Sequence, residues 1–258
     1  MNYRLIRIAM IGWFLLAMAG CATVPRDPAA RAEFKANNDP IEPLNRKIFA
    51  LNLGLDRVLI KPLAKGYRWA LPDWIRDALR HALDNLNEPV VMANCLLQAR
   101  FKSAAITGGR FIVNSTFGAG GLADVTTDEE MPKQAGDFGQ TLWSWGVPGG
   151  PYLVIPLFGP SNPRDGIGQG VDMYIDPFRY VPAHFDYPSA FTTGRVVVDG
   201  IDQRERSIDE LDVIQRDSID YYASLRSLYR QNREAELRGE KTNSTTLPPA
   251  GFYDDPGR

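Results

Sequence analysis

The sequence predicts an all-α fold of amphipathic helices in one domain, joined by irregular connections rich in glycine and proline. Apolar residues recur at helical spacing along most of the chain, which indicates helices with one buried face. At 258 residues the chain fits a single domain with a sizeable core. Its two cysteines, at positions 21 and 95, are too few for a disulfide framework.

Residues 1–20 have the pattern of an export signal. Two arginines precede an apolar stretch of 12 residues, Ile8–Ala19, which is too short to span a bilayer as a permanent helix. Small residues directly before Cys21 are similar to a bacterial lipobox, so we expect cleavage there and acylation of Cys21. The alternative is an ordinary signal peptide followed by a chance cysteine. Ala22 stands where an aspartate would retain an enterobacterial lipoprotein in the inner membrane, and therefore favours the outer membrane.

The rest of the chain divides into three parts by composition. Residues 21–38 are polar and contain two prolines, and we expect a lipidated linker. Residues 39–238 carry the helical patterns and form the predicted domain. Residues 239–258 are rich in Gly, Pro, Ser, Thr and Asp, which is typical of a disordered tail.

Four stretches in the first half of the domain are predicted to be helical. Leu44–Leu55 has apolar residues three and four positions apart. Pro72 opens the clearest amphipathic helix, with its charged residues on one face. Val90–Leu97 is apolar all round, which predicts a separate helix that is buried or lies in a leaflet. Lys102–Phe117 is expected to be another helix.

The second half of the domain is again helical. A helix is predicted to begin at Pro163 and to end near Tyr174. Helical spacing resumes at Ser189, and Ser207 with Glu210 fits a capping box that divides two helices. A last helix is expected over Asp217–Leu237, with its strongly charged end exposed to solvent; docking of this end to a partner is the alternative.

The stretch Phe138–Asp165 lies between these halves and is dense in glycine, proline and apolar residues. It has no His, no Cys and one acidic residue, so it is not typical of a catalytic centre. Irregular backbone at membrane depth is tolerated only where protein encloses it or where it lines a wet cavity. The stretch is therefore our candidate for the wall of a lipid passage.

No pattern for catalysis, metal or nucleotide binding emerges. The two histidines, His81 and His184, lie in no spacing that suits zinc, and no nucleophile elbow or Walker A motif is present. Gly118–Ala123 formally matches a dinucleotide fingerprint, but a polar segment follows it in place of a helix, so a tight, mobile loop is the better interpretation. With a formal net charge of −2 and no long basic run, we expect no nucleic-acid partner. No cofactor is expected either.

Several short groups of residues occur in one order between residues 38 and 230. The first are Asn38-Asp39-Pro40-Ile41-Glu42, Asn45-Arg46, Phe49, Asn52, Asn85-Leu86, Glu88-Pro89, Asn94 and Leu97-Gln98. The next are Arg110-Phe111, Asn114-Ser115-Thr116, Gly118, Gly120-Gly121 and Asp124. The densest block holds Phe138-Gly139-Gln140-Thr141-Leu142, Trp145-Gly146-Val147, Gly149-Gly150-Pro151-Tyr152, Pro156, Gly159-Pro160-Ser161 and Arg164-Asp165. This ordered set resembles the MlaA (VacJ) family of outer-membrane phospholipid-transport lipoproteins.

The resemblance implies a ring-shaped helical domain that lies in the inner leaflet of the outer membrane and faces the periplasm. It implies a central amphipathic channel, association with a trimeric porin, and transfer of phospholipid to a soluble periplasmic carrier of the Mla pathway. Such a channel is passive, has no catalytic residues, and maintains lipid asymmetry by removing misplaced phospholipid from the outer leaflet.

Fourteen positions are candidates for the channel or for lipid contact. A mobile edge of the opening is expected at Gly118, Gly120, Gly121 and Asp124. The passage wall is expected to include Phe138, Gly139, Trp145, Gly149, Pro151, Tyr152, Pro156 and Gly159. Arg164 and Asp165 are expected either to contact a headgroup or to form a structural ion pair at a helix start.

Two other functions stay open at the level of sequence. One is an envelope hydrolase that acts on lipid or peptidoglycan, because the chain holds 31 acidic residues and a catalytic carboxylate pair has no local sequence signature. The other is a purely structural lipoprotein that associates with a porin.

Overall fold

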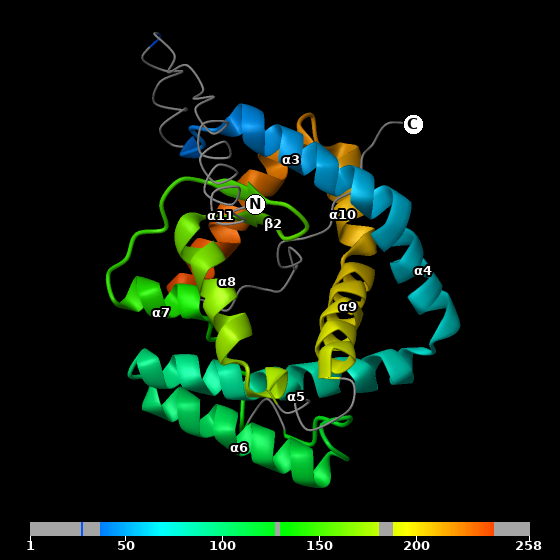
Figure 1. The fold of residues 1–258 in the computed structure, drawn as a ribbon, viewed down its shortest axis with the longest axis vertical. Coiled ribbons are helices and arrows are strands. Elements are labelled where there is room, and N and C mark those ends of the chain that lie inside the picture. The colour runs from blue at the N-terminus through cyan, green and yellow to red at the C-terminus, as the bar shows by residue number, and fades with distance from the viewer. Residues whose placement is uncertain (1–26, 28–36, 127–129, 181–187, 240–258) are drawn as a thin grey trace, which may run out of the picture.

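The computed structural model describes residues 27, 37–126, 130–180 and 188–239 (Figure 1). The predicted signal peptide, Cys21 and most of the linker lie outside these residues, as do His184 and all but the first residue of the predicted tail. The expectations for those segments therefore stay predictions.

Nine α-helices in the described part of the chain make up most of the domain, which confirms the predicted all-α single domain. Figure 1 shows that they follow one another around a ring, with α3 and α4 on one side, α5 and α6 across one end, and α7 and α8 on the other side. The helices are α3 (Glu42–Leu55), α4 (Lys61–Ala70), α5 (Asp73–Leu97), α6 (Phe101–Phe117), α7 (Phe138–Ser144), α8 (Pro163–Ile175), α9 (Pro188–Arg206), α10 (Ile208–Asp217) and α11 (Tyr221–Leu237). A π-helical segment (Asp56–Ile60) joins α3 to α4, and a 3₁₀ turn (Pro177–Arg179) follows α8.

Two helices that the sequence predicted as separate are continuous in the structure. The amphipathic helix after Pro72 and the apolar run Val90–Leu97 are one helix of 25 residues, with Pro89 inside it. Proline removes one backbone hydrogen bond from a helix. The helix continues because Glu88 and Val91, on either side of the proline, are buried, and Glu88 is paired with Arg110 of α6.

The predicted break at Ser207 is present, but the capping box is not. Ser207 Oγ donates to the carbonyl of Gln203 at 2.8 Å, back into α9, and makes no capping bond to α10. The last helix begins at Tyr221, four residues later than predicted, because the Asp220 carboxylate caps it by accepting from the Ala223 amide.

The Phe138–Asp165 stretch contains structure that the sequence did not predict. After α7, two short strands, β1 (Leu153–Ile155) and β2 (Gly159–Ser161), pair antiparallel. Two buried asparagines, seven residues apart on α3, form hydrogen bonds with the backbone of this segment. Each donates from its side-chain nitrogen to a backbone carbonyl and accepts a backbone N–H at its side-chain oxygen. The four bonds are Asn45 Nδ2 to Tyr152 O (3.0 Å), Val154 N to Asn45 Oδ1 (3.0 Å), Asn52 Nδ2 to Ile155 O (3.0 Å) and Leu157 N to Asn52 Oδ1 (2.9 Å).

The main core lies where this hairpin meets α3, α10 and α11. Its buried side chains include four aromatic rings, and Phe49 packs edge-on against Tyr222 with ring centroids 5.4 Å apart. Such pairs add stability beyond the area they bury. The core residues are Phe49, Tyr152, Val154, Leu211, Tyr221, Tyr222 and Leu225.

Large apolar side chains also lie on the outside of the ring. Trp69 is 90% exposed and Trp74 is 71% exposed, at the junction of α4 and α5. On α6, Phe101, Ile112 and Phe117 are each more than 60% exposed. Among the described residues, no helix combines the length and the hydropathy needed to cross a bilayer.

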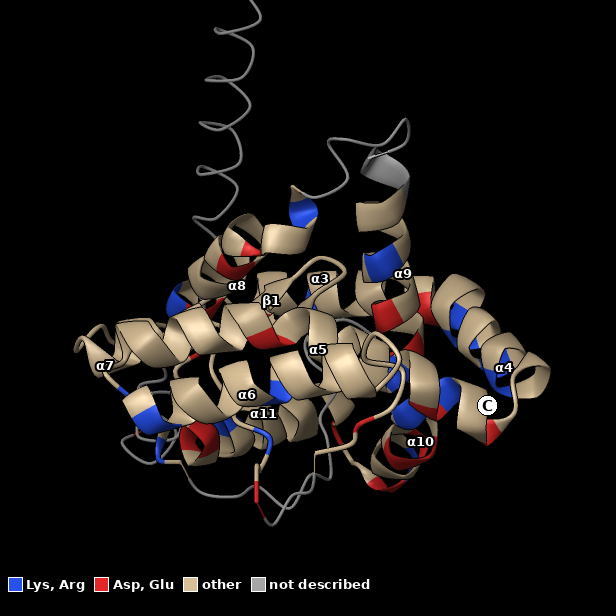
Figure 2. Ribbon diagram, turned by 90° about the horizontal axis from the view of Figure 1, so that it is seen from below, with Lys and Arg blue, Asp and Glu red and all other residues tan. Residues whose placement is uncertain are grey.

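Charge is distributed unevenly over the helices (Figure 2). Five of the ten residues of α10 are charged, whereas α7 carries no charged residue. The ring therefore presents an apolar edge at α6 and α7 and a charged surface at α10.

Candidate functional site

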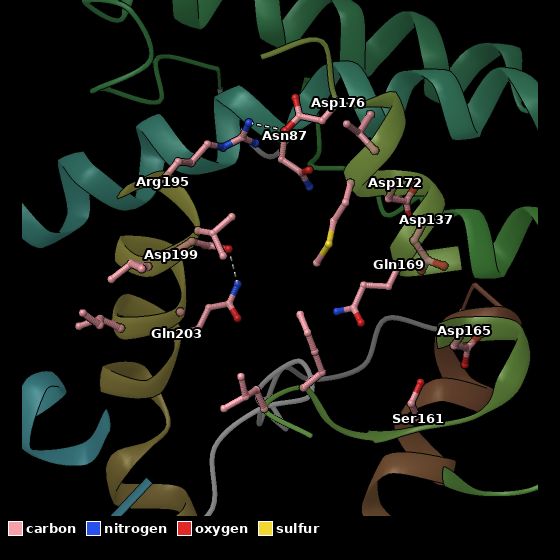
Figure 3. A pocket seen from close by; sticks show the side chains of 18 of the residues that line it. Asn87, Asp137, Ser161, Asp165, Gln169, Asp172, Asp176, Arg195, Asp199 and Gln203 are labelled. Carbon is pink, nitrogen blue, oxygen red and sulfur yellow. Dashed lines mark hydrogen bonds and ion pairs between the residues drawn. The ribbon is translucent and has the colours of Figure 1, made fainter. Parts of the chain in front are cut away.

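A cavity of about 870 Å³ lies inside the ring, with α8 and α9 on facing sides (Figure 3). The remaining lining comes from the π-helical segment, α4, α5, the residue before α7, the β1–β2 hairpin, the 3₁₀ turn and α11. A space of this size is comparable with pockets that hold drug-sized ligands. Because its walls come from segments more than 100 residues apart, the cavity depends on closure of the ring.

Polar side chains form one stripe on each of the two facing helices. Gln169 and Asp172 lie three positions apart on α8 and so share one face, and Asp176, the C-cap residue of the helix, extends this stripe. On α9 the stripe consists of Arg195, Asp199 and Gln203, each four positions from the next. Figure 3 shows the two stripes on opposite sides of the cavity, with Asn87 of α5 between them.

The rest of the lining is apolar. Leu157 and Phe158 come from the β1–β2 turn, while Leu59 and Leu63 come from the other side of the ring. Phe191 and three aliphatic residues of α9 add to this surface. The cavity is thus amphipathic, with polar and apolar groups within reach of one molecule.

Most charged residues of the cavity wall belong to two ion-paired clusters. Arg195 donates to Asp176 Oδ2 at 2.5 Å, and its guanidinium lies 5.8 Å from the centre of the Phe178 ring. The second cluster centres on Arg233 of α11, whose side chain is 12% exposed. The charged end of the last helix was predicted to face solvent; this is correct for Arg230, Glu234, Glu236 and Arg238 but wrong for Arg233.

Arg233 ties α11 to both α7 and α8. It reaches Asp137, the N-cap of α7, at 2.7 Å and Asp165, in the first turn of α8, at 3.0 Å. Burial alone would raise the pKa of Asp165, but hydrogen bonds and charge from Arg233, with a further contribution from Arg164, hold it below its ordinary value. The same contacts raise the pKa of Arg233, against the effect of its burial.

Asp172 has a different environment, since none of the described residues places a Lys or Arg nitrogen within ion-pair distance of it. Its Oδ1 accepts from Asn94 at 2.7 Å and its Oδ2 accepts from the Phe138 amide at 2.9 Å. Burial raises the pKa of Asp172 to about 6, although these two hydrogen bonds act in the opposite direction. An ionised Asp172 therefore costs stability at neutral pH.

This shift predicts a pH-dependent effect of Asp172→Asn. The pKa in the folded protein, about 6, lies above the ordinary value of 3.8, so the folded state binds the extra proton between these values. The stability that this proton contributes is present below about pH 4 and is lost as the pH rises through 6. Asparagine removes that loss. We expect the variant to gain about 1–2 kcal/mol relative to wild type between pH 4 and pH 7.5, a value reduced for partial exposure of the group.

Urea unfolding of the detergent-solubilised protein at the two pH values measures this difference. Comparison of the two pH values cancels any change in hydrogen bonding caused by the amide itself. An equal difference between variant and wild type at both pH values would contradict the assigned pKa.

The structure places the fourteen predicted positions in three groups. Asp165 lines the central cavity. Gly149, Tyr152 and Arg164 line a second, smaller pocket of about 280 Å³. The others line neither, and lipid contact at those positions stays a prediction; they are Gly118, Gly120, Gly121, Asp124, Phe138, Gly139, Trp145, Pro151, Pro156 and Gly159.

Arg164 and Asp165 form the structural arrangement that the sequence left as one of two alternatives. Arg164 is 5% exposed and its Nε donates to Asp165 Oδ1 at 2.9 Å. The Asn162 side chain caps α8 by accepting from the Asp165 amide at 3.0 Å. Asp165 therefore takes part in the N-terminal capping of α8 and also lines the central cavity.

The Gly118–Asp124 loop packs against α5 and α6, and it is tight as predicted. Ala119, Gly120 and Gly121 have φ values of 53°, 75° and 93°, which glycine adopts without strain at the last two positions. Asp124 accepts from Arg110 at 2.5 Å and from Asn114 at 2.9 Å. Hydrogen bonds from these partners and from Thr126 keep the pKa of Asp124 low, against the effect of burial.

The polar stripes of α8 and α9 were missed by the sequence analysis. Their signal was the spacing of polar residues at 169, 172 and 176 and at 195, 199 and 203. Such spacing is typical of any solvated helix face, so it did not distinguish a cavity wall from the outer surface.

Fold and site together define a helical ring around an amphipathic cavity. The chain belongs to the MlaA lipoprotein family, whose model matches residues 37–236. It is 30% identical over 254 residues to the intermembrane phospholipid transport system lipoprotein MlaA of Escherichia coli, covering 97% of this chain and 96% of the relative. The protein of the same description in Haemophilus influenzae is 32% identical over 232 residues, with 88% of both chains covered.

A solved structure described as the structural basis for maintenance of bacterial outer membrane lipid asymmetry has the same fold. It superimposes with a TM-score of 0.66 at 30% sequence identity, covering 77% of this chain and 98% of the solved one. An uncharacterised protein of Rickettsia felis is 34% identical over 201 residues, or 78% of each chain.

Proposed function

We propose that this protein is a passive phospholipid-transfer channel of the outer membrane. It takes misplaced phospholipid from the outer leaflet and passes it to a soluble periplasmic carrier, which maintains lipid asymmetry. The observation that carries the proposal is the pair of polar stripes that face each other across the cavity. The names of the relatives in E. coli and H. influenzae and the subject of the solved structure support it.

The physical problem is the passage of a charged headgroup through hydrocarbon. Transfer of an isolated charge into a medium of low dielectric costs on the order of tens of kcal/mol in the idealised limit. Glutamine, aspartate and arginine side chains on α8 and α9 replace part of the water around the headgroup. The apolar lining, such as Leu157 and Phe158, leaves the acyl chains in a compatible environment.

The outer surface supports a position within one leaflet. Exposed apolar residues of α6 and the tryptophans near the start of α5 suit hydrocarbon and the membrane interface. The charged face of α10 suits the aqueous periplasm. Acyl chains on Cys21 anchor the protein in the inner leaflet of the outer membrane, since several chains bind a bilayer almost irreversibly. A trimeric porin is the proposed partner within the membrane.

The function is tested by removing polarity from both stripes with Gln169→Leu and Gln203→Leu together. Each glutamine can donate to a charged headgroup, and loss of such bonds slows passage by about tenfold or more. In cells that lack the native protein, we expect the double variant to leave phosphatidylethanolamine on the cell surface. A membrane-impermeant amine reagent applied to intact cells measures that lipid.

Gln231→Leu provides the matched control, because Gln231 is an exposed glutamine of α11 that lines neither pocket. It should clear surface phospholipid like wild type. Clearance at the wild-type rate by the double variant, present in normal amount, would refute the channel. Release of fatty acid from phospholipid by the purified protein would instead favour the hydrolase, and porin binding without bound lipid would favour the scaffold.

A further inference from the structure

The charges along the central cavity do not balance. Its described lining includes six acidic residues and three arginines, an excess of three negative charges. Asp137, Asp165 and Glu236 gather around Arg233, and Asp176 pairs with Arg195. Two carboxylates, Asp172 and Asp199, have no Lys or Arg nitrogen of the described residues within ion-pair distance.

These two carboxylates differ in their capacity to bind a ligand. Both oxygens of Asp172 already accept hydrogen bonds, from Asn94 and from the Phe138 amide. Asp199 accepts one, from Gln203 Nε2 to Oδ2 at 3.0 Å. No described group donates to Asp199 Oδ1, so this oxygen is available to a donor in the cavity. Asp172 adds negative potential on the facing wall without being a second ligand.

The surroundings of Asp199 favour a cationic donor over water. Val196, Val197 and Ile201 line the cavity on the same helix, and burial raises the pKa of Asp199 above its ordinary value. A positive group beside the carboxylate would offset this cost of desolvation. Arg206 and Arg195 are near enough to act against this rise in pKa, but neither places a nitrogen within ion-pair distance of Asp199.

A guanidinium lies one helical turn from Asp199 on the same stripe. Arg195 precedes it by four residues, about 6 Å along the helix axis. Arg195 uses one N–H on Asp176, and a guanidinium has five. α9 therefore presents a positive and a negative group to the cavity at a separation that suits a zwitterion with a short linker.

We propose that the cavity selects phospholipids with a zwitterionic, amine-bearing headgroup. Asp199 binds the ammonium group, and Arg195 donates hydrogen bonds to the phosphate. This specificity rests on the proposed transport function and assigns its substrate class. An anionic headgroup without an amine has no partner for Asp199 and meets the excess negative charge of the lining.

The test is a competition between two lipids with the same acyl chains. The full-length lipoprotein, in detergent micelles with equimolar phosphatidylethanolamine and phosphatidylglycerol, is analysed by native mass spectrometry for the lipid it retains. We expect wild type to retain phosphatidylethanolamine over phosphatidylglycerol by about tenfold, as for loss of one charge-assisted hydrogen bond. Asp199→Asn should bring the ratio near one, mainly by loss of the amine lipid.

Asp217→Asn is the control, since Asp217 is 67% exposed on α10 and lines neither pocket; it should keep the wild-type ratio. A thermal melt of each variant checks that it is folded. Equal retention of the two lipids by wild type, or an equal loss of both in Asp199→Asn, would overturn the specificity while leaving the channel intact. Retention of neither lipid by wild type would contradict the proposed function itself.

Discussion

Replacement of Gly168 by alanine is expected to separate α7 from α8 and to abolish transport. A Cβ atom at this position would lie 2.4 Å from the Gly139 amide nitrogen and 2.8 Å from its Cα. These are backbone atoms that cannot rotate away, so the two helices must move apart. The movement would break the bond from the Phe138 amide to Asp172 and disturb the Arg233 cluster. We expect a loss of about 3 kcal/mol in the free energy of unfolding.

Gly170→Ala is the matched control for this prediction. It lies on the same helix, and its Cβ would meet no heavy atom within 4 Å. Alanine favours a helix over glycine by about 1 kcal/mol, so this variant should be neutral or more stable. Urea unfolding and surface phospholipid labelling measure both variants. Equal stability of the two would show that α7 and α8 do not pack this closely.

Asp56→Ala is expected to have the second large effect, on stability alone. Asp56 lies in the π-helical segment and accepts two bonds of 2.9 Å from Arg204 of α9, and both side chains are 0% exposed. Burial raises the pKa of Asp56, although Arg204 partly offsets this. Removal of one partner leaves a buried, uncompensated guanidinium, which costs about 3–5 kcal/mol.

The exposed pair Arg216–Asp217 is the comparison, with side chains 70% and 67% exposed at 3.5 Å. Asp217→Ala should change stability by less than about 1 kcal/mol. The double variant Asp56→Leu with Arg204→Met should recover much of the lost stability, because an apolar pair leaves no unpaired charge. Equal free energies of unfolding for Asp56→Ala and Asp217→Ala would show that the buried Asp56–Arg204 pair does not stabilise the contact between α9 and the π-helical segment.

The helices were predictable where local patterns decide them. Asn162 and Pro163 set the start of α8, and the amphipathic stripe after Pro72 marked α5. The sequence analysis did not predict that the amphipathic helix continues through Pro89 into the apolar run that follows, because proline normally ends a helix. The ion pair that supports this continuation is made by Arg110 of α6. The hairpin of β1 and β2 was missed because its partners include Asn45 and Asn52, about 100 residues away.

By itself, the sequence determined the all-α class, the approximate positions of most helices and the resemblance to the MlaA family. These depend on periodicity, caps and ordered motifs, which are local properties of the chain. Only the tertiary structure decided which polar faces lie inside. The polar stripes of α8 and α9 have the same spacing as solvated helix faces. They become cavity walls because the closed ring places α8 opposite α9.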